Sequence, residues 1–145
     1  MMRAVLTLSA LVIAAVSAVA TEKIPATLYK NPRCSCCDAY AKYLRANGFD
    51  VKVVEHPNMT LIKQQHSVGE KLEGCHTTLI NGYVVEGHVP VGAINRLLNE
   101  KPAIKGIALP GMPAGSPGMS GAKEGPFEIL SITGKDAAPA VFATE

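Results

Sequence analysis

A single turn near the middle of the chain constrains the fold more than any other local feature. Residues 77–87 read TTLINGYVVEG, so the dipeptide Asn81-Gly82 separates two runs rich in β-branched and aromatic residues. Asn-Gly is the preferred dipeptide of a type I′ turn, because both central residues of that turn have positive φ. The sequence therefore predicts an antiparallel hairpin, and any fold assigned to this chain must contain two adjacent strands here.

Hydrophobic periodicity places further elements on both sides of the hairpin. A short strand is expected at 26–30, a helix from Cys36 or Cys37 to Gly48, a strand at 49–56, a weaker helix at 59–68, and a helix between Pro90 and Pro102. The resulting order is β-α-β-α-β-β-α. This is the thioredoxin-like order of an α/β fold, in which a four-stranded sheet carries helices on its two faces.

The composition changes after Ile104. Residues 106–126 are dense in Gly and Pro and have no hydrophobic period, so they predict a long loop. FEILSIT, at 127–133, predicts one further strand at a sheet edge. Residues 135–145 are expected to form a mobile tail.

The first twenty residues have the pattern of a cleaved signal peptide. Arg3 precedes an apolar run, and Ala18–Ala20 has the small-x-small pattern of a cleavage site. We therefore expect an exported protein with no membrane span after cleavage, consisting of one domain over 21–134. The chain has 14 Lys and Arg against 12 Asp and Glu. This near balance gives no indication of a nucleic-acid partner.

The predicted topology brings the soft metal ligands of the chain to one end of the sheet. Three cysteines in NPRCSCCDAY lie at the start of the first helix, where the helix dipole, Lys30 and Arg33 favour thiolate. The third strand runs antiparallel to the first and the fourth returns, so the start of one and the end of the other lie beside these cysteines. The residues expected together are Cys34, Cys36, Cys37, Cys75, His76 and His88.

This set of ligands predicts a copper site. Cys36 and Cys37 diverge by about 100° on a helix, so one tetrahedral ion would hold all four sulfurs only with difficulty. Thiolates can bridge metals, and Cu(I) prefers soft sulfur ligands. More than one Cu(I) is therefore expected, with His76 or His88 tuning the site. The loop repeats PGM, and Met112 and Met119 are candidate thioether ligands or simply loop hydrophobes.

Three other interpretations remain open. The four cysteines could form two structural disulfides, although a disulfide within 34–37 constrains little of the unfolded chain. Cys34, Cys37, Cys75 and His76 could form a Cys₃His zinc site, which would leave Cys36 unused. The Cys34/Cys37 pair could also act as a thiol-disulfide oxidoreductase. The two histidines could instead be hydrogen-bonded loop residues, and His56 and His66 are expected at the surface.

Four motifs resemble those of the CopG-type family of small periplasmic copper-resistance proteins. The motifs are YKNPRCSCCDAY, CHTT, VEGHVP and ALPGMPAGSPGM, and the resemblance covers residues 27–132. It implies a thioredoxin-like fold that binds several copper ions through Cys34, Cys36, Cys37 and Cys75. It also implies a role in copper redox handling and, as partners, copper ions and other periplasmic copper-handling proteins. Thioredoxins carry a cis-proline before the third strand, whereas this chain has His76-Thr77 there, which argues against ordinary dithiol exchange on peptides.

Overall fold

The computed structural model describes residues 22–134 and 138–145, so the expected signal peptide at 1–20 lies outside the described residues. The helices are α1 (Ser35–Ala46), α2 (Met59–Gln65) and α3 (Val91–Glu100), with a 3₁₀ turn at Glu70–Leu72. The strands are β1 (Ile24–Lys30), β2 (Phe49–Glu55), β3 (His76–Ile80), β4 (Tyr83–Glu86), β5 (Gly106–Ala108), β6 (Glu128–Ile132) and β7 (Val141–Thr144). Across these two ranges, none of the helices has the length and apolar character needed to cross a membrane.

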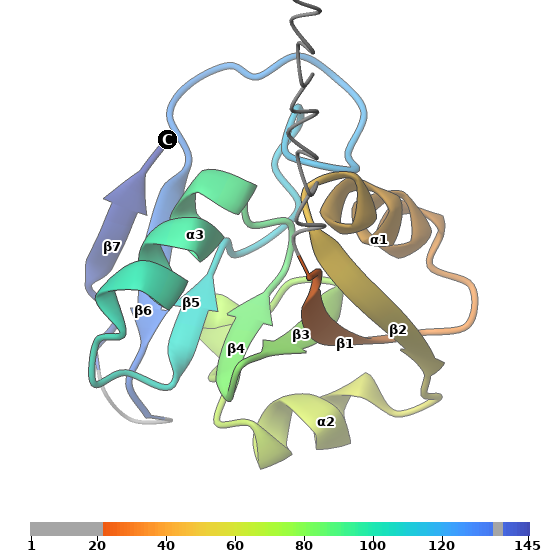
Figure 1. The fold of residues 1–145 in the computed structure, drawn as a ribbon, viewed down its shortest axis with the longest axis horizontal. Coiled ribbons are helices and arrows are strands. Elements are labelled where there is room, and N and C mark those ends of the chain that lie inside the picture. Colours follow the sequence, from red (N-terminus) through yellow and green to blue (C-terminus); the bar gives the residue numbers. More distant parts are fainter. Residues whose placement is uncertain (1–21, 135–137) are drawn as a thin grey trace, which may run out of the picture.

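All seven strands form one sheet in the order β2-β1-β3-β4-β5-β6-β7 (Figure 1). β1 pairs in parallel with β2 and antiparallel with β3, and β3 pairs antiparallel with β4. Asn81 and Gly82 both have positive φ, 47° and 81°, as the predicted type I′ hairpin requires. The predicted α/β, thioredoxin-like order is confirmed over its first four strands and three helices.

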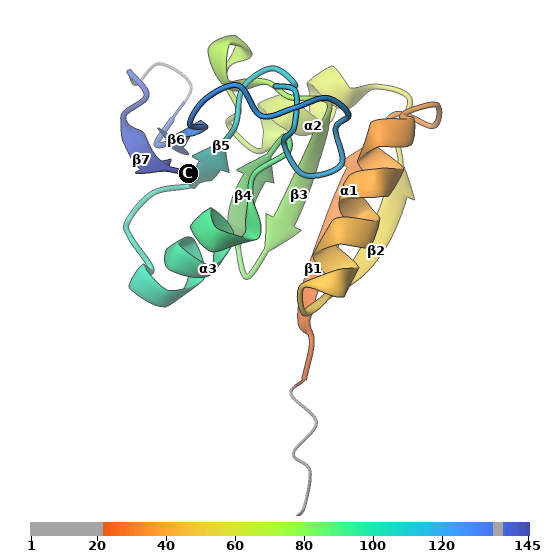
Figure 2. The ribbon, with the colours of Figure 1, turned by 90° about the horizontal axis from the view of Figure 1, so that it is seen from above.

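Helices cover both faces of the sheet (Figure 2). The main core lies under α1 and α3, where Leu44 and Leu97 are fully buried with Ile107 of β5. A smaller core on the α2 side includes Leu72 and Val84. The alternation of side chains along β4 produces this division, since adjacent residues of a strand face opposite sides of the sheet.

β5 lies inside the segment that was predicted to be a loop. Gly106–Ala108 is fully buried and pairs with β4 on one side and β6 on the other. A Cβ on Gly106 would collide with the backbone carbonyl of Val84, so this glycine is required by the close approach of two strands. The prediction of an unbroken loop over 106–126 is therefore wrong at its start.

The prediction of a mobile tail over 135–145 is also wrong for the segment that the structure describes as β7. Val141–Thr144 pairs with β6, which makes β7 the edge strand in place of β6. The backbones of Phe127 and Glu145 exchange hydrogen bonds in both directions, at 2.7 and 3.1 Å. The guanidinium of Arg96, on α3, lies 4.7 Å from the ring centroid of Phe142. These contacts come from distant parts of the chain and order the segment.

The loop at 109–127 reaches from the sheet to α1 and returns to β6 (Figure 2). The loop meets α1 at Gly118, which has a φ of 83°. A Cβ at this position would lie 2.7 Å from the backbone nitrogen of Tyr40, so only glycine fits. The loop therefore lies directly against the helix that carries three of the four cysteines.

Candidate metal centre

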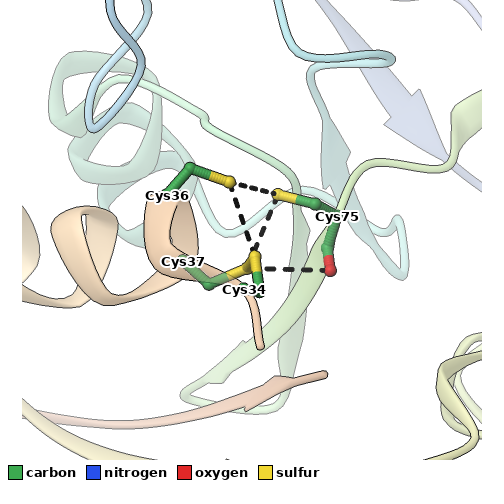
Figure 3. A group of neighbouring side chains, drawn as sticks. All are labelled: Cys34, Cys36, Cys37 and Cys75. Atoms are coloured by element: carbon green, nitrogen blue, oxygen red, sulfur yellow. Dashed lines mark hydrogen bonds between the residues drawn. A yellow bond between two sulfur atoms is a disulfide. The ribbon is translucent and has the colours of Figure 1, made fainter. Parts of the chain in front are cut away.

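The four cysteine sulfurs meet between the N-terminus of α1 and the start of β3 (Figure 3). Cys34 is the N-cap of α1, and Cys36 and Cys37 lie in its first turn. Cys75 immediately precedes β3, whose first residue, His76, pairs with the last residue of β1. The predicted order and direction of the strands therefore account for the convergence.

The sulfur atoms lie within 4.8 Å of one another. The Sγ of Cys36 is 3.4 Å from the Sγ of Cys34 and 3.6 Å from that of Cys75. The Sγ of Cys37 is also 3.6 Å from the Sγ of Cys75. The expected divergence of Cys36 and Cys37 thus does not keep either sulfur away from Cys75.

Cys34 and Cys37 form a disulfide, while Cys36 and Cys75 are free thiols. Cys37 is fully buried, and the other three cysteines are half-buried. A purely structural role for the four cysteines would use two disulfides, whereas the structure contains one. Two thiols remain directly beside this bond, close enough for exchange with it.

The Cys75 thiol is held in its protonated form when no metal is bound. Burial, followed by the charge of the neighbouring Cys36, raises the pKa of Cys75 to about 12. A metal ion that binds here must displace this proton, as is usual for thiolate ligands. The electropositive environment predicted for the cysteines of α1 therefore does not extend to Cys75.

Lys30 holds the turn before α1 and pairs with a carboxylate of that helix. The side chain is only 3% exposed. Its Nζ donates to the carbonyl oxygen of Cys34 at 3.3 Å and of Pro32 at 3.4 Å, and pairs with the Asp38 carboxylate at 3.0 Å. The positive charge predicted to favour thiolates is thus largely compensated by Asp38.

His76 and His88 are both fully buried and both contact Cys75. The Sγ of Cys75 is 3.3 Å from His76 Nδ1 and 2.9 Å from His88 Nε2. Tyr40 packs against the two imidazoles, with ring centroids 4.5 and 5.4 Å away. Burial lowers the pKa of each histidine, so both are neutral at neutral pH and can act as metal ligands.

The tautomer of neutral His88 follows from its second contact. Its Nδ1 lies 2.7 Å from the carbonyl oxygen of Pro117, which can only accept a hydrogen bond. The proton is therefore on Nδ1, and Nε2 presents its lone pair to Cys75. A histidine whose Nδ1–H is held by a backbone carbonyl is typical of metal ligands.

The remaining sequence candidates lie less centrally. Met112 is 52% exposed on the loop. Met119 is half-buried beside Gly118, in the part of the loop that touches α1. His56 and His66 are half-buried where surface positions were expected, and neither belongs to a potential metal-binding group of the described ranges 22–134 and 138–145.

A buried ion pair that holds the backbone next to Cys75 was not predicted from the sequence. Lys63 of α2 pairs with Glu86 of β4, and their side chains are 5% and 0% exposed. Glu86 also accepts hydrogen bonds from the backbone nitrogen of Gly74 at 2.8 Å and the hydroxyl of Thr77 at 2.6 Å. This network holds the backbone immediately before Cys75. The one available sequence signal was a charged residue, Glu86, directly after the apolar residues of a strand.

Comparison with known proteins places this arrangement in a family. A family model described as "Protein of unknown function, DUF411" matches residues 72–119. No curated protein matches the chain. Two solved structures are similar, both described as copper resistance protein CopG, in form 2 and form 1. Each is 34% identical, with a TM-score of 0.77, and the match covers 86% of this chain and 99% or 98% of theirs. With this identity over nearly the whole length of those proteins, the chain belongs to the CopG family of copper-resistance proteins.

Proposed function

We propose that this chain is a periplasmic copper-resistance protein that binds Cu(I) through Cys34, Cys36, Cys37 and Cys75 once the disulfide is reduced. The observation that carries the proposal is the convergence of four cysteine sulfurs within 4.8 Å of one another. Thiolates are soft ligands that favour Cu(I), although they also bind zinc and Fe–S clusters. The similar structures described as copper resistance proteins support the choice of copper, and the pattern of residues 1–20 supports export.

The site could hold one copper ion or several. Four sulfurs around one tetrahedral ion, with metal–sulfur bonds of about 2.3 Å, lie about 3.8 Å apart. Three of the sulfur pairs, at 3.4 to 3.6 Å, are near this value, so a single ion could also be held after the Cys34–Cys37 disulfide is reduced. We propose several Cu(I) ions because thiolates bridge metals and Cu(I) accepts low coordination numbers. Sulfurs this close together can then be shared between ions.

Binding at all four sulfurs requires reduction of the disulfide. Two electrons and two protons convert the Cys34–Cys37 bond into two thiols, and an external thiol reductant can supply both. The reverse reaction can be coupled to copper: two Cu(II) ions oxidise two thiols to a disulfide, which yields two Cu(I) ions and releases two protons. Sequestration of Cu(I), with this exchange as a redox function, is the proposed basis of resistance.

A stoichiometric titration tests the proposal. The reduced protein is titrated anaerobically with Cu(I) against a competing chelator, and native mass spectrometry counts the bound ions. We expect more than one copper per chain and a lower number when Cys36 and Cys75 are both replaced by serine. Met59→Leu, which removes a sulfur that is not a candidate ligand from the first residue of α2, serves as the control and should change nothing. A single ion, or a stoichiometry that survives the double replacement, would contradict the polynuclear site.

A second function is favoured by the disulfide itself. It joins half-buried Cys34 to fully buried Cys37 at the N-terminus of α1, the arrangement expected of a dithiol oxidoreductase. In that reaction the Cys34 thiolate attacks a substrate disulfide and Cys37 resolves the mixed disulfide. Cys75, with its Sγ 3.6 Å from that of Cys37, would compete for the second step. Metal-free protein that fails to reshuffle a scrambled disulfide substrate would exclude this function.

A further inference from the structure

We propose that Cys75, His76 and His88 form a second metal site, which binds a single divalent transition-metal ion while Cys34 and Cys37 remain joined in the disulfide. One sulfur and two imidazole nitrogens lie within 4.8 Å of one another here. The site shares Cys75 with the proposed Cu(I) site and depends on neither sulfur of the disulfide. The two proposals can therefore fail separately.

The three donor atoms need little movement to take up an ion. Metal–sulfur bonds of about 2.3 Å and metal–nitrogen bonds of about 2.0 Å place sulfur and nitrogen about 3.6 Å apart in a tetrahedral site. The Sγ of Cys75 is already 3.3 Å from His76 Nδ1 and 2.9 Å from His88 Nε2. Each nitrogen must therefore move away from the sulfur by less than about 1 Å.

Both imidazoles are free to donate a lone pair. The bond from His88 Nδ1 to the Pro117 carbonyl fixes the tautomer that leaves Nε2 unprotonated. His76 is fully buried, and its Nε2 has no hydrogen-bond partner within the described part of the chain. The backbone carbonyl of Gly87 also acts on this ring, where it opposes the lowering of the His76 pKa by burial. Coordination of an ion by Nδ1, the nitrogen 3.3 Å from the Cys75 sulfur, places the ring proton of His76 on Nε2.

The donor set differs in kind from the four sulfurs beside it. A disulfide sulfur is not an anionic ligand, so the bond between Cys34 and Cys37 leaves the sulfur-only site incomplete. The set of one thiolate and two imidazoles is unaffected by that bond. Two nitrogens and one sulfur suit ions of intermediate softness, including Cu(II) and Zn(II), rather than Cu(I) held by thiolates alone.

An ion can reach the site from the cysteine side. Cys75 is half-buried, whereas both histidines are closed off behind Tyr40 and the loop at Pro117. The free thiol of Cys36 lies 3.6 Å from the Cys75 sulfur on this side. The three protein ligands therefore leave a fourth position toward the entrance, and the ion displaces the proton of Cys75 as it binds.

Co(II) is the probe for the test, because it does not oxidise thiols and reports thiolate ligation through a charge-transfer band. The protein with its disulfide intact is titrated with Co(II), and the absorption of the complex is recorded. We expect one Co(II) per chain, with the spectrum of a tetrahedral site. The band should disappear in Cys75→Ser, and affinity should fall by more than about 100-fold in His88→Gln, beyond the loss typical of outer-shell changes. His56→Gln and His66→Gln are the matched controls and should bind like the unmodified protein.

Two measurements decide the proposal even if a histidine variant does not fold. X-ray absorption of Co(II) bound to the unmodified protein should show one sulfur and two imidazole nitrogens, and a shell of several sulfurs or of oxygens alone would overturn the assignment. The Cys34→Ser/Cys37→Ser variant should keep its Co(II), and loss of binding there would also overturn it. Absence of Cu(I) binding by the reduced protein would refute the proposed function and leave this site standing.

Discussion

Replacement of Lys63 by methionine tests the buried network that supports Cys75. The change keeps most of the volume of the side chain but leaves the Glu86 carboxylate without its cation. Removal of one partner from a buried ion pair destabilises a protein by about 3–5 kcal/mol. Glu86 keeps its bonds from Gly74 and Thr77. We therefore expect a loss at the lower end of this range, about 3 kcal/mol.

Urea denaturation of three variants gives the measurement. Lys63→Met alone should lower the free energy of unfolding by that amount with an unchanged m-value. Lys63→Met combined with Glu86→Gln removes both charges and keeps an acceptor for the Gly74 amide, so it should recover more than half of the loss. Lys71→Met is the matched control, because Lys71 is exposed and its removal should cost less than about 0.5 kcal/mol.

The pH dependence of the single variant has a definite sign. Burial raises the pKa of Glu86 above its ordinary value of 4.5, and Lys63 is the strongest influence that opposes this shift. Without Lys63 the folded protein holds the Glu86 proton more tightly than the unfolded chain does. The destabilisation should therefore be absent below the unfolded pKa and appear as the pH rises through the folded pKa. Relative to the unmodified protein, Lys63→Met should gain stability as the pH is lowered from neutral toward the ordinary carboxyl pKa of 4.5.

The reasoning fails if Lys63→Met unfolds within about 1 kcal/mol of the unmodified protein. It also fails if the double variant is no more stable than the single one, because the cost would then arise from lost packing and not from an unpaired charge. Copper titration of the folded variants adds a functional test. Lys63→Met should displace the Gly74 backbone next to Cys75 and so weaken Cu(I) binding, whereas the Lys71→Met control should bind copper normally.

Three further outcomes are expected. Gly118→Ala should destabilise the protein by more than Gly111→Ala, as chemical denaturation of the two variants would show. Both glycines have positive φ, but only a Cβ at position 118 would collide with the backbone of Tyr40. Tyr40→Phe should lower the free energy of unfolding by about 1 kcal/mol in the same assay, because the buried hydroxyl donates to the carbonyl oxygen of Val89 at 2.8 Å. Amide exchange of Phe127 and Glu145 should be slow, since the two backbones are bonded to each other, and rapid exchange at both would refute the assignment of β7.

The convergence of the cysteines was predictable because it depends on topology and not on detail. The Asn81-Gly82 turn fixes β3 and β4 as neighbours, and the strand order then brings the start of β3 and the end of β4 to the N-terminus of α1. Cys75 and His88 reach the same place for that reason. The oxidation state of Cys34 and Cys37 was not predictable, since the same spacing serves a disulfide and a metal site equally well.

The missed features depend on partners that are distant in the sequence. Gly106 was taken as a sign of a loop, but its lack of a side chain is what lets β5 lie against β4. β7 has four residues, too few for a periodic pattern, and becomes a strand only because β6 is available to pair with it. The sequence carried no sign that Lys63 is buried, because a lysine is rarely buried unless it is paired.

The loop over the sulfurs has one more consequence, which concerns engineering. β5 and β6 are antiparallel neighbours, so residues 109–127 are the connection of a hairpin, and both ends are anchored a strand spacing apart. Doubling the length of such a connection costs only about 0.6 kcal/mol in closure entropy. The connection can therefore be lengthened at positions away from Pro117 and Gly118, which contact His88 and α1, with little effect on the sheet beneath it. The length of the loop and its contacts at the metal centre are thus separately adjustable properties of this protein.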